Sequence, residues 1–273
     1  MQIRKVPRPL VFAVVLVATA AAMIIAVPMA SARQIPLDVD STVFAHLSVH
    51  AAGSSGHSTA TLPAGTVTST NWSGYAATGG GPYTSVTTSW VQPAVNCSAT
   101  PNSYAAFWAG LDGYSSDTVE QDGTLTECIG RQAEYLAWYE TYPNPMYQFG
   151  GTVSPGDLLT ATVTSVSPTE FTLTLSDSPA SAGAKPWTAT TTQTLKQAAA
   201  LSSAEVIAEA PSSGYRILPL ADFGIASFEN PVIDSTPLGS LTGVVPIEMT
   251  TTRGVGESIP SALSSSGFSV QWQ

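Results

Sequence analysis

Hydrophobic and polar residues alternate with a period of two along much of the chain after residue 68. In "EFTLTLSDSP", Phe171, Leu173 and Leu175 alternate with Thr172 and Thr174, as in a strand that buries one face. Similar short runs, separated by Gly, Pro, Ser and Asp, are "YTSVTTSWVQP", "AEYLAWYETYP", "LLTATVTSVSP", "WTATTTQTL" and "GFSVQWQ". The pattern predicts an all-β domain, either a sandwich or a barrel.

The segment "TLKQAAALSSAEVIAEA" is the fair helical alternative, but its Ser pair and its β-branched second half argue against one long helix. As a strand, its end "SAEVIAEAP" places Glu205, Ile207 and Glu209 on one face and small apolar residues on the other. No basic residue lies within this run. Two carboxyl groups are therefore expected side by side, and this position requires a chemical explanation.

The N-terminus has the features of a secretory signal. Three basic residues precede an apolar run of 18 residues, 10–27, and the small residues Ala30 and Ala32 follow at the spacing of a cleavage site. We predict a signal peptide over residues 1–32. An uncleaved anchor is the alternative, which the absence of a basic cluster after the apolar run disfavours. The mature protein is expected to be secreted to the extracellular space.

Residues 33–66 are rich in Gly, Ser, Ala and Thr and predict a prosegment or linker. All three histidines, His46, His50 and His57, lie here. They are interpreted as solvated linker residues, with a pH-sensitive prosegment as the alternative. The composition then changes, and residues 67–273 predict one β domain with no internal repeat.

Charge excludes several classes of partner. From Thr66 onward the chain holds five basic and 17 acidic residues, a net charge of −12. Nucleic acid and anionic membrane surfaces are therefore not expected partners. After signal cleavage, no association with a membrane is expected. The balance favours an acidic working environment or simply reflects an acidic secreted protein.

The exported domain lacks the usual catalytic groups. It has no histidine, which removes Ser-His-Asp and Cys-His catalysis and imidazole-ligated metal sites. The two cysteines, Cys97 and Cys128, predict one disulfide worth about 3 kcal/mol. The acid-rich "DGYSSDTVEQDG" fits no EF-hand spacing, so no metal and no cofactor is expected. An enzyme of this composition would use Asp, Glu or Tyr, as in a β-sandwich glycoside hydrolase or an acid peptidase.

Four motifs occur in order: "TNWSGYA", "FWAGLDGYSSDTVEQDG", "AWYETYP" and "SAEVIAEAP". Together they closely resemble the glutamic peptidases, or eqolisins, formerly grouped as family A4, over about residues 68–235. The resemblance implies a curved β-sandwich of two antiparallel sheets, of the concanavalin-like or jelly-roll type. It also implies a secreted acid endopeptidase that is made as a proenzyme and cleaves proteins or peptides. A monomer is expected.

The resemblance also implies the site. Glu209, the second acid of the A-E-x-x-x-E motif, would be the general base that activates water, and Gln121 would stabilise the oxyanion. Four further positions fall in the family's binding-face motifs and are expected to contact substrate: Trp72, Trp108, Asp112 and Glu140. The alternatives are purely structural roles: core packing for the two tryptophans and a turn for Asp112-Gly113.

Two positions complicate this assignment. Asp122 follows Gln121 where a small or neutral residue is common in the family, and we expect it to add negative field near the site. Asn71 begins a glycosylation sequon, and a glycan there would crowd the site. The alternative functions are a carbohydrate-active or carbohydrate-binding β-sandwich and an inactive relative of the family that serves as a surface interaction protein.

Overall fold

The computed structural model describes residues 49–50, 62–214 and 216–273. The predicted signal peptide and most of the predicted prosegment lie outside the described residues, so both assignments stay predictions. Within the described ranges, no helix is long and apolar enough to cross a membrane.

Nearly all regular structure is β-strand, and the one helical element is the 3-10 turn η1 (Leu238–Ser240). The long strands of the fold are β3 (Trp72–Ala77), β4 (Ser85–Val91), β5 (Tyr104–Leu111), β6 (Val119–Ile129), β7 (Gln132–Tyr142), β9 (Leu158–Ser167), β10 (Glu170–Ser178), β11 (Trp187–Thr194), β12 (Ala204–Glu209), β15 (Ile225–Ile233), β17 (Val244–Thr250), β18 (Gly256–Pro260) and β19 (Gly267–Trp272). Short strands complete it: β1 (Val49–His50), β2 (Val67–Ser69), β8 (Tyr147–Gln148), β13 (Ser212–Ser213), β14 (Arg216–Ile217) and β16 (Thr236–Pro237).

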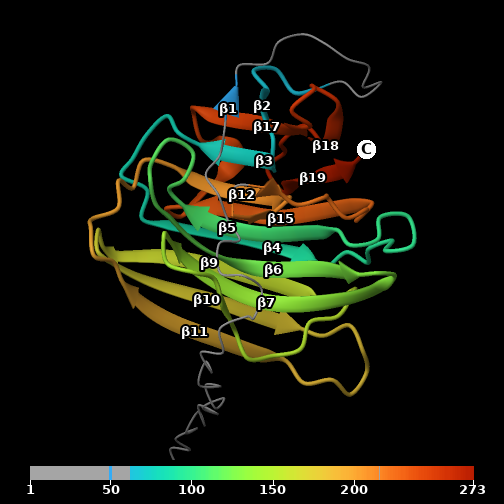
Figure 1. Cartoon of the computed structure of the whole chain (residues 1–273). Helices are drawn as coiled ribbons and strands as arrows, with labels where there is room; N and C mark the ends of the chain where they lie inside the picture. Colours follow the sequence, from blue (N-terminus) through green and yellow to red (C-terminus); the bar gives the residue numbers. More distant parts are fainter. Residues whose placement is uncertain (1–48, 51–61, 215) are drawn as a thin grey trace, which may run out of the picture.

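One hydrogen-bonded path connects almost all of the strands (Figure 1). It runs β11–β10–β9–β4–β15–β19–β18–β17–β3–β12–β5–β6–β7 through antiparallel pairs. The path folds back on itself at β17, β18 and β19, so that β7–β6–β5–β12–β3 form one layer and β11–β10–β9–β4–β15 the other. This is the β-sandwich of antiparallel sheets that the sequence predicts.

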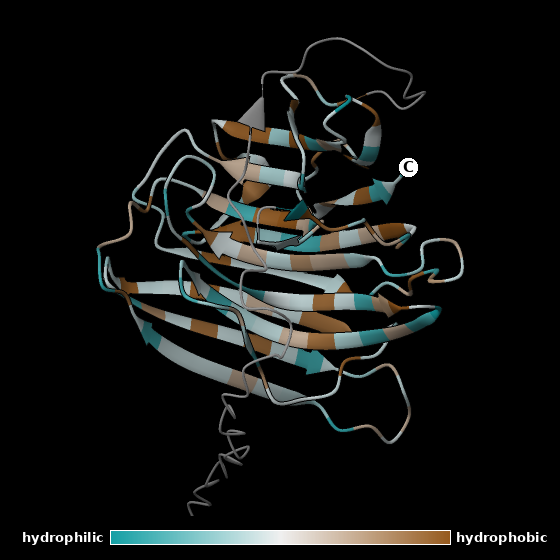
Figure 2. Ribbon diagram, viewed as in Figure 1, coloured by the Kyte–Doolittle hydropathy of each residue, from teal (hydrophilic) through white to brown (hydrophobic). Residues whose placement is uncertain are grey.

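The core lies between the two layers and is lined by alternate residues of each strand, visible as alternating bands in Figure 2. Along β10, Phe171, Leu173 and Leu175 are fully buried while the residues between them are only partly buried, which confirms the alternation read from the sequence. The other layer behaves differently: every residue of β3 and β12 is buried. A second apolar cluster covers the far face of that layer, and this face carries the candidate site.

Hydroxyl groups dominate the outward face of the β4–β9–β10–β11 layer. Cross-strand pairs of Thr and Ser side chains hydrogen-bond to one another along it: Thr87 with Thr162 at 3.1 Å, Ser89 with Thr160 at 2.8 Å, Thr174 with Thr190 at 3.0 Å and Ser176 with Thr188 at 3.0 Å. Such pairs stabilise a sheet through direct cross-strand contacts. This face is therefore hydrated through neutral groups.

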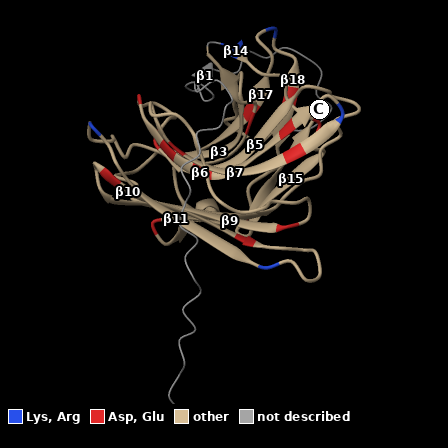
Figure 3. Cartoon of the chain, turned by 60° about the horizontal axis from the view of Figure 1, so that its bottom comes forward, with Lys and Arg blue, Asp and Glu red and all other residues tan. Residues whose placement is uncertain are grey.

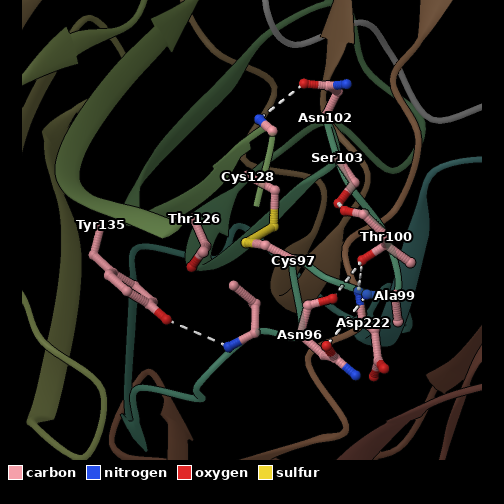
Figure 4. The surroundings of a disulfide bond; sticks show 12 residues. Asn96, Cys97, Ala99, Thr100, Asn102, Ser103, Thr126, Cys128, Tyr135 and Asp222 are labelled. Atoms are coloured by element: carbon pink, nitrogen blue, oxygen red, sulfur yellow. Dashed lines mark hydrogen bonds between the residues drawn. A yellow bond between two sulfur atoms is a disulfide. The ribbon is translucent and has the colours of Figure 1, made fainter. Parts of the chain in front are cut away.

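The predicted disulfide joins Cys97, in the connection before β5, to Cys128 near the end of β6 (Figure 4). Hydrogen bonds brace the same region: Asn102 Oδ1 accepts from the Gly130 N–H at 2.9 Å, and the Tyr135 hydroxyl accepts from the Val95 N–H at 3.3 Å. The bridge fixes the end of β6 against the segment that leads into β5, so it secures two of the strands that carry the site.

Candidate active site

Strand β12 lies at the centre of the site layer because it pairs with β3 on one side and β5 on the other. The helical alternative for this segment is wrong, since residues 204–209 form a strand. Glu205, Ile207 and Glu209 point to the outer face of the layer, and the alternate residues Ala204, Val206 and Ala208 point into the core. The strand places its two carboxyl groups as the sequence predicts.

Gln121 lies two strands away, on β6. It is directly opposite Gly110 of β5 on one side and Glu140 of β7 on the other. Its amide nitrogen Nε2 donates a 2.8 Å hydrogen bond to Glu140 Oε2. Burial raises the pKa of Glu140 to about 8, although this hydrogen bond lowers it. Glu140 thus fixes the orientation of the Gln121 amide, because its carboxyl oxygen accepts from the NH₂ end.

Glu209 is almost completely buried and accepts hydrogen bonds at both oxygens. The Trp108 indole N–H donates to Oε2 at 2.8 Å, and Asn71 Nδ2 donates to Oε1 at 3.2 Å. Burial raises the pKa of Glu209 well above its usual value, and the charge of Glu140 acts in the same direction. The Trp108, Trp72 and Asn71 side chains oppose this rise because they favour the ionised carboxylate.

Strand β5 separates Gln121 from Glu209. Glu209 pairs with Ala106 and Gln121 pairs with Gly110, so the two residues lie on either side of the β5 stretch 106–110, which has Trp108 at its middle. In an antiparallel sheet directly paired residues share a face, so all of these side chains project from the same surface. The charge of Glu140 reaches Glu209 across this surface. Gln121, Glu140 and Glu209 therefore form one electrostatic group.

The two tryptophans expected at the site lie on this face. The rings of Trp72 and Trp108 pack edge to face, with centroids 4.8 Å apart and an interplanar angle of 77°. Both belong to the apolar cluster that covers the outer face of the layer. Each tryptophan is therefore a buried residue of this second cluster that also lies beside Glu209, and contact with substrate stays a prediction.

A close approach of backbones requires glycine at position 123. A Cβ atom on Gly123 would lie 2.1 Å from the carbonyl oxygen of Phe107 and 2.7 Å from Cβ of Trp108. Any side chain there would push β6 away from β5. The glycine therefore keeps β6 close to β5 at Trp108, the residue whose indole N–H donates to Glu209.

Asp112 follows β5 directly, with a positive φ of 66°. Its carboxylate accepts hydrogen bonds from the backbone N–H groups of Leu201 and Ser202, both at 2.7 Å, and from the Ser202 hydroxyl at 2.9 Å. These contacts hold the segment that leads into β12. In the described structure Asp112 thus positions the strand of Glu209, and a direct contact with substrate stays a prediction.

The expectation for Asp122 is wrong. Residues alternate across a strand, so Asp122 points to the opposite side of β6 from Gln121, into the space between the layers. It is fully buried, and neither carboxyl oxygen accepts a hydrogen bond from a residue that the structure describes. Burial raises its pKa well above the usual value. Asp122 therefore does not add field on the site face.

Asn71 is the site residue that sequence reasoning missed. The sequence marks it only as the start of a glycosylation sequon, whereas the structure buries its side chain, which donates to Glu209. A glycan attached to this nitrogen would remove that arrangement. The available signal was its position beside Trp72 in the "TNWSGYA" motif, which placed it next to a residue assigned to the site.

Basic side chains are absent from the site as the structure describes it. The Lys and Arg residues of ranges 62–214 and 216–273 are all exposed, and Figure 3 shows them at the periphery. Within the same ranges, no group of three or more His, Cys, Asp or Glu is placed to hold a metal ion. The chemistry available on this face is therefore that of carboxyl, amide and indole groups.

Carboxyl and amide groups on one buried face of an all-β sandwich define a class of acid–base hydrolase, and sequence comparison specifies which one. The model of the peptidase A4 family matches residues 70–272. The chain belongs to this family, the glutamic peptidases or eqolisins, and is a glutamic-type endopeptidase. This membership decides against the carbohydrate alternative.

Known relatives agree. Aspergillopepsin-2 of Aspergillus niger is 29% identical over 195 residues, which cover 64% of this chain and 67% of the relative. The crystal structure of aspergilloglutamic peptidase from Aspergillus niger has a TM-score of 0.52 at 25% identity, covering 63% of this chain and 99% of that chain. Scytalido-glutamic peptidase with a transition state analog inhibitor shares the fold, with a TM-score of 0.63 at 22% identity over 75% of this chain and 98% of that chain.

Proposed function

We propose that this peptidase is a secreted acid endopeptidase in which Glu209 is the general base and Gln121 stabilises the oxyanion. The observation that carries the proposal is the arrangement on one face of β12, β5 and β6. Glu209 is held by Trp108, and the Gln121 amide is held by Glu140. Peptides or proteins are the substrates, as the transition-state analog bound to scytalido-glutamic peptidase also suggests.

The reaction requires only these groups. The Glu209 carboxylate removes a proton from a water molecule, and the water oxygen bonds to the scissile carbonyl carbon. The carbonyl oxygen becomes negative and accepts a hydrogen bond from Gln121. A primary amide has two N–H donors, so one remains after the bond to Glu140. Glu209 then returns the proton to the departing amine as the C–N bond breaks.

The charge state of Glu209 links the site to pH. With the carboxyl buried its pKa is raised, so the described conformation favours the protonated form in acid. Hydrolysis requires water beside Glu209, and this water removes part of the desolvation. The Trp108 and Asn71 donors then favour the ionised base. A carboxylate base of this kind works below the pH range in which histidine is neutral.

Secretion is supported by the signal-like N-terminus together with the Cys97–Cys128 disulfide, because such bonds persist in oxidising compartments. Trp72 and Trp108 contribute apolar surface next to Glu209 and are proposed to contact the substrate. We further propose that Asp112 acts by holding the segment before β12. A monomer and a prosegment removed before activity stay predictions.

The test compares hydrolysis of a denatured protein by the wild type and two variants from pH 2 to 7, with pepstatin present. Glu209→Gln should abolish activity, and Gln121→Ala should lower kcat by about 100- to 1,000-fold, the usual cost of one oxyanion donor. Glu134→Gln and Gln132→Ala, which change exposed residues of β7, are the matched controls. Full activity of either site variant would refute the dyad.

A further inference from the structure

Gln121 offers one donor to the oxyanion, because the other N–H of its amide is used by Glu140. The backbone beside it adds none. Strand β6 lies between β5 and β7 and pairs with both at Gln121, so its backbone N–H groups are engaged in the two ladders. Oxyanion holes combine donors that are fixed in place before the reaction. A second donor next to Gln121 therefore has to come from a side chain.

Glu140 is the side chain in that place. It is directly opposite Gln121 across β6 and β7, so both project from the site face. Gln121 Nε2 donates to its Oε2 at 2.8 Å, and its second oxygen, Oε1, forms no hydrogen bond with a residue that the structure describes. A protonated carboxyl group accepts at one oxygen and donates from the other. Neutral Glu140 can thus accept from Gln121 and present an O–H group at Oε1.

The spacing of the two donors suits a single oxygen atom. Donors lie about 2.7–3.1 Å from the oxyanion that they stabilise, so two donors that share it are at most about 6 Å apart. Gln121 Nε2 is 2.8 Å from Glu140 Oε2, and Oε1 is bonded to the same carbon as Oε2. Nε2 and Oε1 therefore lie within this limit.

The surroundings of Glu140 favour its neutral form. The side chain is 2% exposed, and every Lys and Arg of ranges 62–214 and 216–273 is exposed at the surface. The titratable groups on the same face are acids and phenols, none of which carries a positive charge: Glu205, Glu209, Tyr114 and Tyr142. A buried carboxyl group without a cation is stable chiefly when it is protonated.

Electrostatics separates the roles of the two carboxyl groups. Burial raises the pKa of Glu140 to about 8, although the hydrogen bond from Gln121 lowers it. Glu140 and Glu209 also interact, so ionising both places two negative charges on one buried face. With Glu209 ionised as the base, Glu140 stays protonated. Carboxyl groups kept neutral by an apolar site serve as oxyanion donors in other enzymes.

We propose that Glu140, as a neutral carboxylic acid, is a further catalytic residue that donates a hydrogen bond from Oε1 to the oxyanion beside Gln121. The proton stays on Glu140 throughout, and Glu209 still carries the proton from water to the departing amine. The inference rests on the proposed function and deepens it, because it assigns a donor where only a contact with substrate was expected.

The kinetic test compares two variants at pH 4 on a fluorogenic peptide. Glu140→Leu removes the donor and should lower kcat by about 100- to 1,000-fold with KM nearly unchanged, since the contact forms in the transition state. Glu140→Gln still accepts from Gln121 and presents an amide N–H, so it should lose no more than about tenfold. Glu134→Gln, an exposed position on the same face of β7, is the control.

Infrared difference spectra detect the donor itself. At pH 4 the difference between the wild type and Glu140→Gln should contain the carbonyl band of one protonated carboxyl group. Binding of a peptide transition-state analog should shift this band in the wild type, because the Glu140 O–H then donates to the analog oxygen. Glu134→Gln should leave both the band and its shift in place.

Three results would overturn this role of Glu140. The first is a wild-type kcat in Glu140→Leu. The second is a folded Glu140→Gln that is as inactive as Glu209→Gln, which would mean that an ionised carboxylate is needed. The third is a difference spectrum that lacks the protonated band, or a band that the analog does not move. The spectra need only the wild type and the Gln variant, so they decide even if the Leu variant does not fold. A wild type without peptidase activity would refute the proposed function itself, whereas these results in an active enzyme refute only the second donor.

Discussion

Replacing Trp108 by Phe isolates one hydrogen bond at the proposed base. The substitution keeps an aromatic ring but removes the indole N–H that donates to Glu209 Oε2 at 2.8 Å. A hydrogen bond to a charged group contributes about 1.5 to 3 kcal/mol. Its loss disfavours the ionised carboxylate and therefore raises the pKa of Glu209. Since 1.36 kcal/mol corresponds to one pKa unit, the expected rise is about one to two units.

The assay is the pH dependence of kcat/KM on a fluorogenic peptide between pH 2 and 7. If Glu209 must be ionised to act as base, the acid limb of the profile should move up by about one to two pH units. Below that limb, activity at fixed pH should fall by roughly 10- to 100-fold. Binding should change less, because the apolar ring remains and Trp72 still packs beside it.

The matched control is Trp90→Phe. Trp90 is fully buried in the core between the layers, beside Phe228, and its indole N–H meets no acceptor among the described residues. It should cost stability to a similar degree without moving the acid limb. If Trp108→Phe folds like the control and its acid limb stays within about 0.3 unit of the wild type, Glu209 is not the titrating base.

Two further predictions concern stability. Replacing both Cys97 and Cys128 by Ser opens a loop with a sequence separation of 31 residues, which should lower the free energy of unfolding by about 3 to 4 kcal/mol in urea titrations; an unchanged value would contradict the chain-entropy account. Asp122→Asn should stabilise the protein increasingly as pH rises. Because the pKa of Asp122 is raised, the folded state binds more protons than the unfolded state above about pH 4. The stability of the wild type is therefore full below this pH and falls above it. The fall is at most about 1.4 kcal/mol per pH unit. Urea unfolding at pH 4 and 6.5 tests this, and an equal effect of the substitution at both pH values would count against it.

The fold could be predicted where one face of a strand meets water. The alternation along β10 identified it directly, because the two faces lie in different environments. Strand β12 was ambiguous for the opposite reason. Both of its faces are buried, so no alternation marks it, and length and β-branched residues had to decide between helix and strand. The return of the chain through β17, β18 and β19, which joins the layers, has no local signature in the sequence.

The site was only partly accessible to sequence reasoning. Motif order located Gln121 and Glu209, but hydrogen bonds between distant segments depend on tertiary packing, and the bond from Asn71 to Glu209 spans 138 positions. Strand geometry alone argues against the expectation for Asp122, because a residue next to Gln121 on a strand must point to the other face.

The paired Thr and Ser side chains on the outward face of β4, β9, β10 and β11 have a consequence for solubility. Most proteins stay dispersed through net charge, and an acidic protein loses that charge when its carboxylates protonate. Hydroxyl groups do not titrate in this range. The hydration of this large surface is therefore the same at pH 2 as at pH 7, and it resists self-association in the acidic medium where charge repulsion is weakest.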